Sequence, residues 1–414
     1  MMKLDTVMNV CGTEKCSACG ACINICPKGC ISYLKKETGT KVAVINKNSC
    51  INCHLCKKVC PQLDTVEGSE SFACYAAWSF DDTIRTNSAS GGIATELYRF
   101  FSEKGYKLAG VSMTPMHTAE FSLSDSFESI PAYRNSKYVY SNAGNIYSEV
   151  GKNLTNQRGV LFVGLPCQVA ALKKYLLVKK ISLDLLFTVD IVCHGTTPEQ
   201  FLVEHIGYIE KKKNKKAICV EFRDPDEKTS SFTFSLKDAK TTFYKRKVKA
   251  NDVYQIGYHK GITYRDNCYL CQFATRKRQG DITLADFSYV GSYEPCSYSN
   301  ENVSCVLINS KKGERLFSEL CSADRIFYEK RPLEEEVTTE KQLNYPTRVP
   351  MERETFLREL KSNKGFEKAM KHAVRKIMIV NTVKNITHIE KIRQIMSEKL
   401  PPNVKNGVKK VLKR

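Results

Sequence analysis

The chain has 414 residues, with 64 Lys or Arg against 44 Asp or Glu, and it contains 19 cysteines. The length predicts two or three domains, and a composition of 42% hydrophobic and 26% charged residues excludes a disordered or fibrous protein. No apolar run approaches the ~18 residues of a spanning helix, and the first residues lack a hydrophobic signal segment. We therefore expect a cytoplasmic protein, in which so many reduced thiols indicate metal or redox chemistry rather than disulfides.

Two cysteine repeats stand near the beginning of the chain. Each repeat reads C-x-x-C-x-x-C-x-x-x-C and is followed by proline; the eight cysteines are Cys16, Cys19, Cys22, Cys26, Cys50, Cys53, Cys56 and Cys60. In bacterial two-cluster ferredoxins the fourth cysteine of such a repeat binds the other cluster. We therefore assign Cys60 to one 4Fe-4S cluster, with the first three cysteines of the first repeat. Cys26 then completes the second cluster with Cys50, Cys53 and Cys56.

The residues between the repeats predict a hairpin. Residues 31–34 and 42–45 read as short strands around a turn at 37–40, as a two-cluster ferredoxin module requires. Zinc is the alternative, but zinc ribbons use two separated C-x-x-C pairs rather than a repeated triple. We expect a ferredoxin-like α+β domain over residues 1–65 and a polar linker over 66–71, with His54 outside the ligand set.

A serine- and glycine-rich loop follows the next predicted strand, at residues 72–78. The loop contains Ser88, Ser90, Gly91 and Gly92 and precedes apolar residues at helical spacing over 93–101. Small residues that open a helix offer N–H groups to an anion such as a cofactor phosphate. Taken alone, the loop is better explained as a serine-rich helix cap with flexible glycines.

A βαβ unit is predicted over residues 160–192. The strand at 160–163 leads through Gly164 to Cys167 and a helix, and a second strand at 185–192 leads to Cys193. The crossover makes the two strands parallel, and ligand sites in such sheets gather at the carboxyl ends of the strands. We therefore expect Cys167 and Cys193 at one rim, with Cys167 at a helix start that favours its thiolate form.

A second cysteine pair lies further along the chain. A helix is expected to open with Thr197 as N-cap and Pro198 as its first residue. Strands are expected at 217–222 and 231–236, followed by the pair Cys268 and Cys271 and then by the stretch 281–287. With Cys167 and Cys193 the pair makes four thiolates, for which a third cluster, a zinc ion or plain buried thiols are all open interpretations. We assign no chemistry to the seven remaining cysteines: Cys11, Cys30, Cys74, Cys219, Cys296, Cys305 and Cys321.

The end of the chain is basic. Residues 365–414 carry 13 Lys or Arg against 3 Glu. Their net charge of +10 is half of the chain's net charge of +20. Apolar residues recur there at roughly helical spacing: Ile377, Ile379, Val380, Val383, Ile386, Ile389, Ile392, Ile395 and Met396. Such a helix either lies on an anionic membrane surface or packs one face on the domain. Further basic runs at 211–216 and 244–249 come with no nucleic-acid motif, so no nucleic-acid partner is expected.

Taken together, these stretches resemble the family of coenzyme F-420 hydrogenase/dehydrogenase beta subunits. The resembling stretches are 88–92, 136–139, 161–168, 189–195 and 268–286, and they span residues 72–310. The resemblance implies an α/β domain that binds FAD, and a third 4Fe-4S cluster on Cys167, Cys193, Cys268 and Cys271. It also implies that the flavin is contacted by the loop with Ser88, Ser90, Gly91 and Gly92 and by the Lys137–Tyr138 segment.

Two residues stand out as catalytic candidates within this resemblance. Asp286 falls in a stretch that matches the family's Ala-Asp-x-Ser-x-Gly region, although many ferredoxin-fused relatives have Gly-Asp-Phe-Trp where this chain has Ala285 to Ser288. His194 follows Cys193 and is either a proton donor to substrate or a support for the cluster. Use of a deazaflavin coenzyme is also open.

We therefore expect a two-cluster ferredoxin module fused to an α/β flavin domain with a mixed sheet, over 72–345, and a basic helical C-terminal region, over 346–414. The expected function is that of an iron–sulfur flavoprotein oxidoreductase. A mobile ferredoxin arm would exchange electrons with a ferredoxin-type carrier, and a small molecule, by family analogy a polysaccharide precursor, would react at the flavin. A peripheral membrane contact through the tail is included in this expectation. The alternative is a non-catalytic electron-transfer subunit that serves a partner enzyme.

Overall fold

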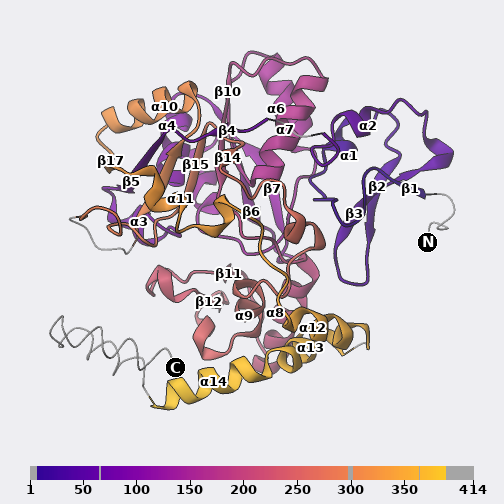
Figure 1. Ribbon diagram of the computed structural model, residues 1–414, viewed down its shortest axis with the longest axis vertical. Coiled ribbons are helices and arrows are strands. Elements are labelled where there is room, and N and C mark those ends of the chain that lie inside the picture. Colours follow the sequence, from indigo (N-terminus) through magenta and orange to yellow (C-terminus); the bar gives the residue numbers. More distant parts are fainter. Residues whose placement is uncertain (1–6, 65–66, 297–301, 363, 388–414) are drawn as a thin grey trace.

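The computed structural model describes residues 7–64, 67–296, 302–362 and 364–387. Figure 1 shows three groups of elements: a small N-terminal module, a larger body built on a broad sheet, and a lower group of helices around a small sheet. No helix in the described part of the chain is long and apolar enough to cross a membrane.

The N-terminal module contains the predicted hairpin. Its strands are β2 and β3, which pair antiparallel, and an unpredicted strand β1 adds to the free edge of β3. A short helix, α1 or α2, carries the third cysteine of each repeat. The bounds are β1 Val7–Asn9, α1 Ala21–Ile25, β2 Ile31–Lys35, β3 Lys41–Asn46 and α2 Leu55–Lys58.

The segment predicted as a linker is partly a strand. β4 (Ser69–Glu70) pairs antiparallel with β14 (Lys277–Arg278). The connection between the module and the body is therefore hydrogen-bonded to the chain that follows Cys271.

The body is built on a mixed sheet of nine strands among the described residues. In spatial order these are β17 (Ile326–Arg331), β5 (Ala73–Ser79), β16 (Ser304–Ile308), β15 (Ile282–Asp286), β10 (Leu186–Ile191), β9 (Val160–Gly164), β6 (Lys107–Met113), β7 (Ala119–Ser124) and β8 (Ser141–Asn142). The four strands β15, β10, β9 and β6 run parallel, and the predicted parallel pair is β9 and β10. The carboxyl ends of β9, β10 and β15 consequently meet at one rim of the sheet.

Helices cover both faces of this sheet. Alternate residues of β9 point to opposite faces, so Leu161 joins one core while Val160 and Phe162 join the other. The first face is covered by α4 (Ile93–Glu103), α5 (Ile130–Tyr133) and α10 (Lys311–Ser322), and the second by α6 (Ile146–Thr155) and α7 (Pro166–Val178). Two short helices, α3 (Asp82–Thr86) and α11 (Leu333–Val337), border the sheet at β5.

The lower group has a core of its own. Its small antiparallel sheet consists of β11 (Cys219–Glu221), β12 (Thr233–Lys237) and β13 (Thr242–Lys247). Around it pack α8 (Glu199–Lys213), α9 (Val253–His259), α12 (Glu352–Lys361), α13 (Gly365–Ala373) and α14 (Arg375–Thr387). Of the apolar tail positions, Ile389, Ile392, Ile395 and Met396 lie outside the described residues.

The predicted start of α8 is wrong by one residue. Thr197 is fully buried, and its hydroxyl lies 2.8 Å from that of Thr263 instead of capping the helix. Pro198 has an extended backbone, with ψ of 137°, so the helix begins at Glu199.

The ferredoxin module is docked on the body, and the expectation of a mobile arm is not met. One continuous core contains Val44 and Ile45 of the module together with Tyr147 of α6 and Phe162 of β9. Figure 1 shows the module beside α6 and α7, and α1 contacts both of these helices.

Candidate redox centres

The first group of thiols in the module surrounds a cavity of about 300 Å³. It is lined by Cys16, Cys19, Cys22 and Cys60, the four cysteines assigned to one cluster from their spacing. The N–H of Ala43 donates to Cys16 Sγ over 3.4 Å, as backbone amides do around cluster sulfurs. Burial raises the pKa of the Cys19 thiol to about 12.

Cys11 lines the same cavity, although no chemistry was expected of it. Its thiol interacts with the thiols of Cys16 and Cys60, which raises the pKa of Cys11 and lowers the pKa of the other two. Cys11 therefore favours the thiolate form of two proposed ligands, and it lies close to the sulfurs that would bind iron. It has no fixed spacing to either repeat, so the sequence pattern gave no signal for it.

The second group of thiols lies nearer the surface. Burial raises the pKa of the Cys56 thiol, and the neighbouring thiols of Cys50, Cys53 and Cys26 raise it further. Cys53 is exposed, and the N–H of Asn52 donates to Cys50 Sγ over 3.4 Å. Cys30, also expected to be inert, lies 3.4 Å from Cys26, sulfur to sulfur. His54 is exposed and is the N-cap residue of α2.

The third group of thiols is assembled by the sheet. Cys167 lies in the first turn of α7, after β9, and Cys193 follows β10, so both stand at the predicted rim. Cys268 and Cys271 come from the loop after α9. All four line one cavity of about 640 Å³.

The walls of this cavity fit a cluster. Two buried polar atoms in the lining have no hydrogen-bond partner among the described residues: Nη2 of Arg278 and Oδ1 of Asn267. Arg278 is held by Asp190, whose carboxylate lies 3.4 Å from that Nη2. The Nη2 group of Arg278 is a hydrogen-bond donor, and donors of this kind suit the sulfides of a cluster. A zinc ion, with Zn–S of about 2.3 Å, would need four sulfurs in close contact, and no described group of three or more His, Cys, Asp or Glu is arranged around a single ion.

The pKa of Cys167 is raised, although its place at a helix start was expected to favour the thiolate form. Burial raises the pKa well above its ordinary value, and the neighbouring Cys271 and Cys193 thiols raise it further.

The first and third cavities share a wall. Ser17 lines both cavities, and the Cys19 thiol of the first raises the pKa of Cys167 in the third through its charge. The buried Arg265 fixes this wall: its guanidinium donates to the carbonyl oxygens of Ser17, Cys16 and Lys41, over 2.6, 3.3 and 3.3 Å.

Tyrosine hydroxyls hold the same loop from the body. Tyr140 donates to the carbonyl of Ala18 and Tyr147 to that of Cys19, each over 2.8 Å. The two candidate cluster sites are consequently held at a fixed separation.

Arg223 joins three segments that the family resemblance associates with the flavin. Its Nε donates to the Tyr138 hydroxyl over 2.5 Å, its Nη1 to the Ala89 carbonyl over 2.6 Å, and its Nη2 to Asp286 Oδ2 over 2.5 Å. The loop of residues 88–92, Tyr138 and Asp286 are therefore brought together. Arg223 itself was missed because a single arginine after a three-residue strand carries no sequence pattern.

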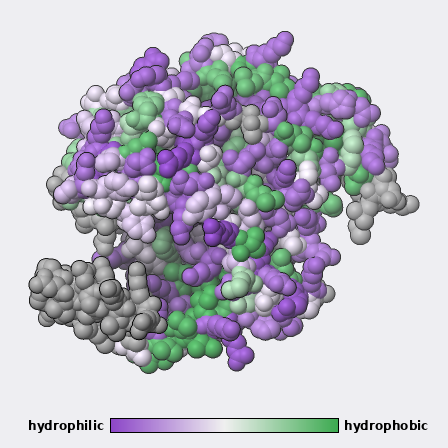
Figure 2. Space-filling view, viewed as in Figure 1, coloured by the Kyte–Doolittle hydropathy of each residue, from purple (hydrophilic) through white to green (hydrophobic). Residues whose placement is uncertain are grey.

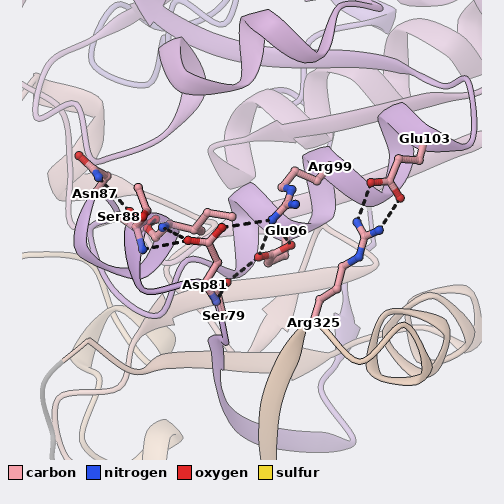
Figure 3. Close-up of polar contacts among 10 residues, drawn as sticks. Ser79, Asp81, Asn87, Ser88, Glu96, Arg99, Glu103 and Arg325 are labelled. Carbon is pink, nitrogen blue, oxygen red and sulfur yellow. Dashed lines mark hydrogen bonds and ion pairs between the residues drawn. The ribbon is translucent and has the colours of Figure 1, made fainter.

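The loop of residues 88–92 is anchored from beneath. Figure 3 shows Ser88 turned toward α3, and its hydroxyl donates to the Ile84 carbonyl over 2.7 Å. A Cβ on Gly91 would lie 2.3 Å from the Ala77 carbonyl oxygen, so only glycine allows this approach to β5. Gly91 N–H and Ser90 Oγ both bond Ser304 Oγ, at 2.9 and 2.7 Å. Much of this predicted binding loop thus serves the fold directly.

The base of α4 is fixed by a separate set of polar contacts, also drawn in Figure 3. Asp81 caps α3 by accepting from the N–H groups of Thr83 and Ile84. The buried Glu96 accepts from the Ser79 hydroxyl over 2.5 Å and pairs with Arg99. These contacts position the helix start that follows Gly92.

Lys137 points into the protein backbone. Its ammonium donates to the Arg134 carbonyl over 2.9 Å, and burial lowers its pKa to about 8. Its predicted contact with a flavin is not tested by these bonds.

Aromatic side chains connect the Arg223 site with the third group of thiols. Tyr138 stacks on Tyr258 with centroids 4.3 Å apart, and Tyr258 meets Tyr264 at 5.3 Å. Gly195, with φ of 140°, lets the turn after Cys193 pack on Tyr264, where a Cβ would come within 2.4 Å of the ring. His259 packs on Phe232 at 4.3 Å, and burial together with Arg223 lowers its pKa to about 3.

The two catalytic candidates lie at different sites. His194 lines the mouth of the third cavity, is about half exposed, and has its Nε2 3.7 Å from Glu340. Asp286 stands at the end of β15, paired with Arg223. The structure therefore does not bring them into one catalytic pair.

Comparison with known proteins matches both parts of the chain. Residues 157–334 match the family model for the C terminus of the coenzyme F420 hydrogenase/dehydrogenase beta subunit, and residues 15–63 match the 4Fe-4S dicluster domain. The chain is similar to a subunit of the F(420)H(2) dehydrogenase of Methanosarcina mazei, at 21% identity over 202 residues, covering 47% of this chain and 57% of that protein. An uncharacterized ferredoxin of Methanocaldococcus jannaschii is 42% identical over 48 residues, covering 12% of this chain and 61% of the ferredoxin.

A solved structure of the F420-reducing NiFe hydrogenase complex from Methanosarcina barkeri also aligns, with a TM-score of 0.42 and 18% identity. The alignment covers 74% of this chain and 94% of the chain in that complex. The present chain spans less than two thirds of the length of the curated relatives named above. The family expected from the sequence is confirmed: the protein joins a 4Fe-4S dicluster ferredoxin domain to a C-terminal domain of the family of coenzyme F-420 hydrogenase/dehydrogenase beta subunits.

Proposed function

We propose that this protein is an iron–sulfur flavoprotein oxidoreductase that passes electrons between its ferredoxin clusters and a small-molecule substrate bound at FAD. The observation that carries the proposal is the shared wall at Ser17, which places the third group of thiols against the first ferredoxin group. When bound, flavin exchanges electrons in pairs or singly, and each cluster carries one electron. The three sites together would connect two-electron substrate chemistry with one-electron carriers.

The thiols divide among three clusters in this proposal. The ligands are Cys16, Cys19, Cys22 and Cys60 for the first, Cys50, Cys53, Cys56 and Cys26 for the second, and Cys167, Cys193, Cys268 and Cys271 for the third. Arg278 would donate to the sulfurs of the third cluster from the cavity wall. Arg265 and the tyrosines around it keep the first site in contact with that cavity.

FAD would occupy the region organised by Arg223. Its contacts would come from the loop of residues 88–92 and from the Lys137–Tyr138 segment, while Asp286 orients the guanidinium. The buried rings of Tyr258 and Tyr264 lie between this region and the third cavity. A deazaflavin coenzyme is the substrate to test first, because the similar Methanosarcina mazei protein is named as part of an F(420)H(2) dehydrogenase. Sugar precursors of polysaccharides are the second class to test.

Anaerobic purification with iron, sulfide and flavin determination tests the proposal. About twelve irons per chain are expected from three four-iron clusters, and one FAD. Eight irons would remove the third cluster, and a chain without flavin would overturn the flavoprotein assignment. Arg223→Gln should lower the FAD content about tenfold or more, because it removes a charged donor to three segments. Arg246→Gln, an exposed arginine on β13, is the matched control.

A non-catalytic subunit of a larger complex is the second candidate function. It is favoured by the name of the Methanosarcina mazei relative, which is itself one subunit of a dehydrogenase. Under this alternative the purified protein would exchange electrons with a ferredoxin-type carrier but turn over no small molecule. Stopped-flow reduction by reduced deazaflavin, with ferredoxin as acceptor, separates the two: multiple turnovers by the isolated chain support the enzyme.

A further inference from the structure

The C-terminal helix α14 presents four apolar side chains to solvent, while two others, Ile377 and Met378, pack against the core of the lower group. Ile379, Val380, Val383 and Ile386 are exposed at 54%, 50%, 50% and 72%. A rotation of about 100° per residue places all four on one side of the helix. We call these four residues the α14 stripe. Figure 2 shows hydrophobic surface where α14 runs along the lower edge of the molecule.

The inner side of α14 faces the lower group, where amide and hydroxyl groups hold it beside the packed Ile377 and Met378. Asn251 donates to the Met378 carbonyl and to the Thr382 hydroxyl, over 3.1 and 3.0 Å. Asn381 donates to Asn251, and Asn385 donates to the Lys249 carbonyl over 2.9 Å. A helix that only covered a domain would bury its apolar stripe. These hydrogen bonds therefore fix the helix in an orientation in which the α14 stripe faces solvent.

Cations border the α14 stripe. On the helical wheel Arg375 lies at one edge, Lys384 at the other and Lys376 within the stripe near the helix start, and all three are exposed. α14 contains no carboxylate. The Lys249 contact brings the helix against the basic run of residues 244–249. Beyond Thr387 the sequence continues with eight Lys or Arg against two Glu over residues 388–414.

We propose that α14 docks this protein on an anionic lipid bilayer, with the α14 stripe in the interface and the flanking cations at the headgroups. An outward apolar stripe between cations is the arrangement of interfacial helices, and each Lys or Arg near such a surface adds to binding. A protein interface would instead favour a core depleted of charge. This inference does not depend on the redox function, since it uses no residue of the candidate redox centres.

Flotation of the full-length, cluster-loaded protein with vesicles tests the proposal. The vesicles contain equal parts phosphatidylglycerol and phosphatidylcholine, or phosphatidylcholine alone. The protein should float with the anionic vesicles and remain in solution with the neutral ones. Ile379→Ser with Val383→Ser should lower the partition coefficient about tenfold or more, and so should Lys376→Glu with Lys384→Glu. All four side chains are exposed, so the fold should be preserved and the iron content unchanged.

Matched controls separate the α14 stripe from exposure in general. Met116→Ser removes a side chain that is 78% exposed in a distant turn, and Lys240→Glu reverses a charge in the turn before β13; neither should change flotation. A wild-type protein that stays in solution, or a stripe variant that floats as well as wild type, overturns the proposal. A stripe variant that instead turns a lipid-free dimer into a monomer overturns it in favour of self-association. A chain ended at Thr387 that still floats supports α14 itself as the docking element.

Discussion

The ferredoxin module and the α/β body gather their cysteines in different ways. Each group in the module takes three thiols from seven consecutive residues and one from the other repeat. The third group takes its thiols from three segments between residues 167 and 271, and they meet because β9 and β10 are parallel neighbours. The first kind of site is therefore determined by local spacing, whereas the second exists only when the whole sheet has formed.

The largest effect should come from removing one thiol of each kind. Cys193→Ser is expected to reduce the iron content from about twelve to about eight per chain, with the electron paramagnetic resonance signals of both ferredoxin clusters retained. Cys19→Ser removes a ligand from the local group, and should leave the third cluster's signal in place. Loss of all iron from the Cys193 variant would show that the three sites form only together, and would remove the distinction between local and assembled sites.

The next largest effect should come from removing Arg265, which joins the body to the ferredoxin module. Arg265→Met removes a buried guanidinium and leaves the carbonyls of Cys16, Ser17 and Lys41 without their donor. We expect a loss of about 3 kcal/mol in the free energy of unfolding, and faster amide exchange in the loop of residues 16–20. Arg276→Met, a half-exposed arginine, should change neither. Unchanged exchange in the Arg265 variant would mean that the shared core alone docks the module.

A pH effect should come from the lower group and not from the module. Burial would lower the pKa of His205, but the carboxylates of Asp252 and Glu367, 3.1 and 2.9 Å away, raise it to about 9. The stabilisation is therefore fully present below the unfolded pKa of about 6.5 and is lost as the pH rises through 9. Chemical denaturation from pH 6 to 10 should show a loss of up to about 3 kcal/mol. A His205→Gln variant with the same pH dependence would assign the loss to another group.

The smallest effect is a change in the reduction potential of the third cluster. Arg278→Gln removes a buried positive charge beside Cys193 and Cys271. We expect the midpoint potential of the third cluster to fall by about 60 mV, which is one tenfold step for a one-electron couple. A redox titration followed by paramagnetic resonance measures it. The ferredoxin clusters serve as internal controls, and a fall in their potentials as well would contradict a local role for Arg278.

The sequence predicted most where the signal was local. The hairpin of β2 and β3, the strands β5, β9 and β10, and the beginning of α4 at residue 93 agree with the expected segments. Periodicity and cysteine spacing report on neighbours along the chain, and these elements depend on such neighbours. The parallel pairing of β9 and β10 was also predictable, because the handedness and length of a βαβ crossover leave few alternatives.

The sequence predicted least where tertiary contacts decide. Cys11 and Cys30 belong to no spacing pattern, and only the packed module brings them to Cys16 and Cys26. Arg223 acts through three segments that are far apart along the chain. The docked position of the module depends on Arg265 and Tyr147, whose partners are backbone carbonyls that any residue type supplies. Ligation of each cluster and contact with FAD stay predictions for the experiments above.

The short pairing of β4 with β14 has a kinetic consequence. A tethered carrier that swings between partners obeys an effective concentration set by its linker. Here the connecting residues are hydrogen-bonded in register to the chain just after Cys271, and the module is already seated. In the proposed function, electron transfer between the first and third sites would then be first order, with a rate that does not depend on protein concentration. Only the exchange with an outside carrier remains second-order.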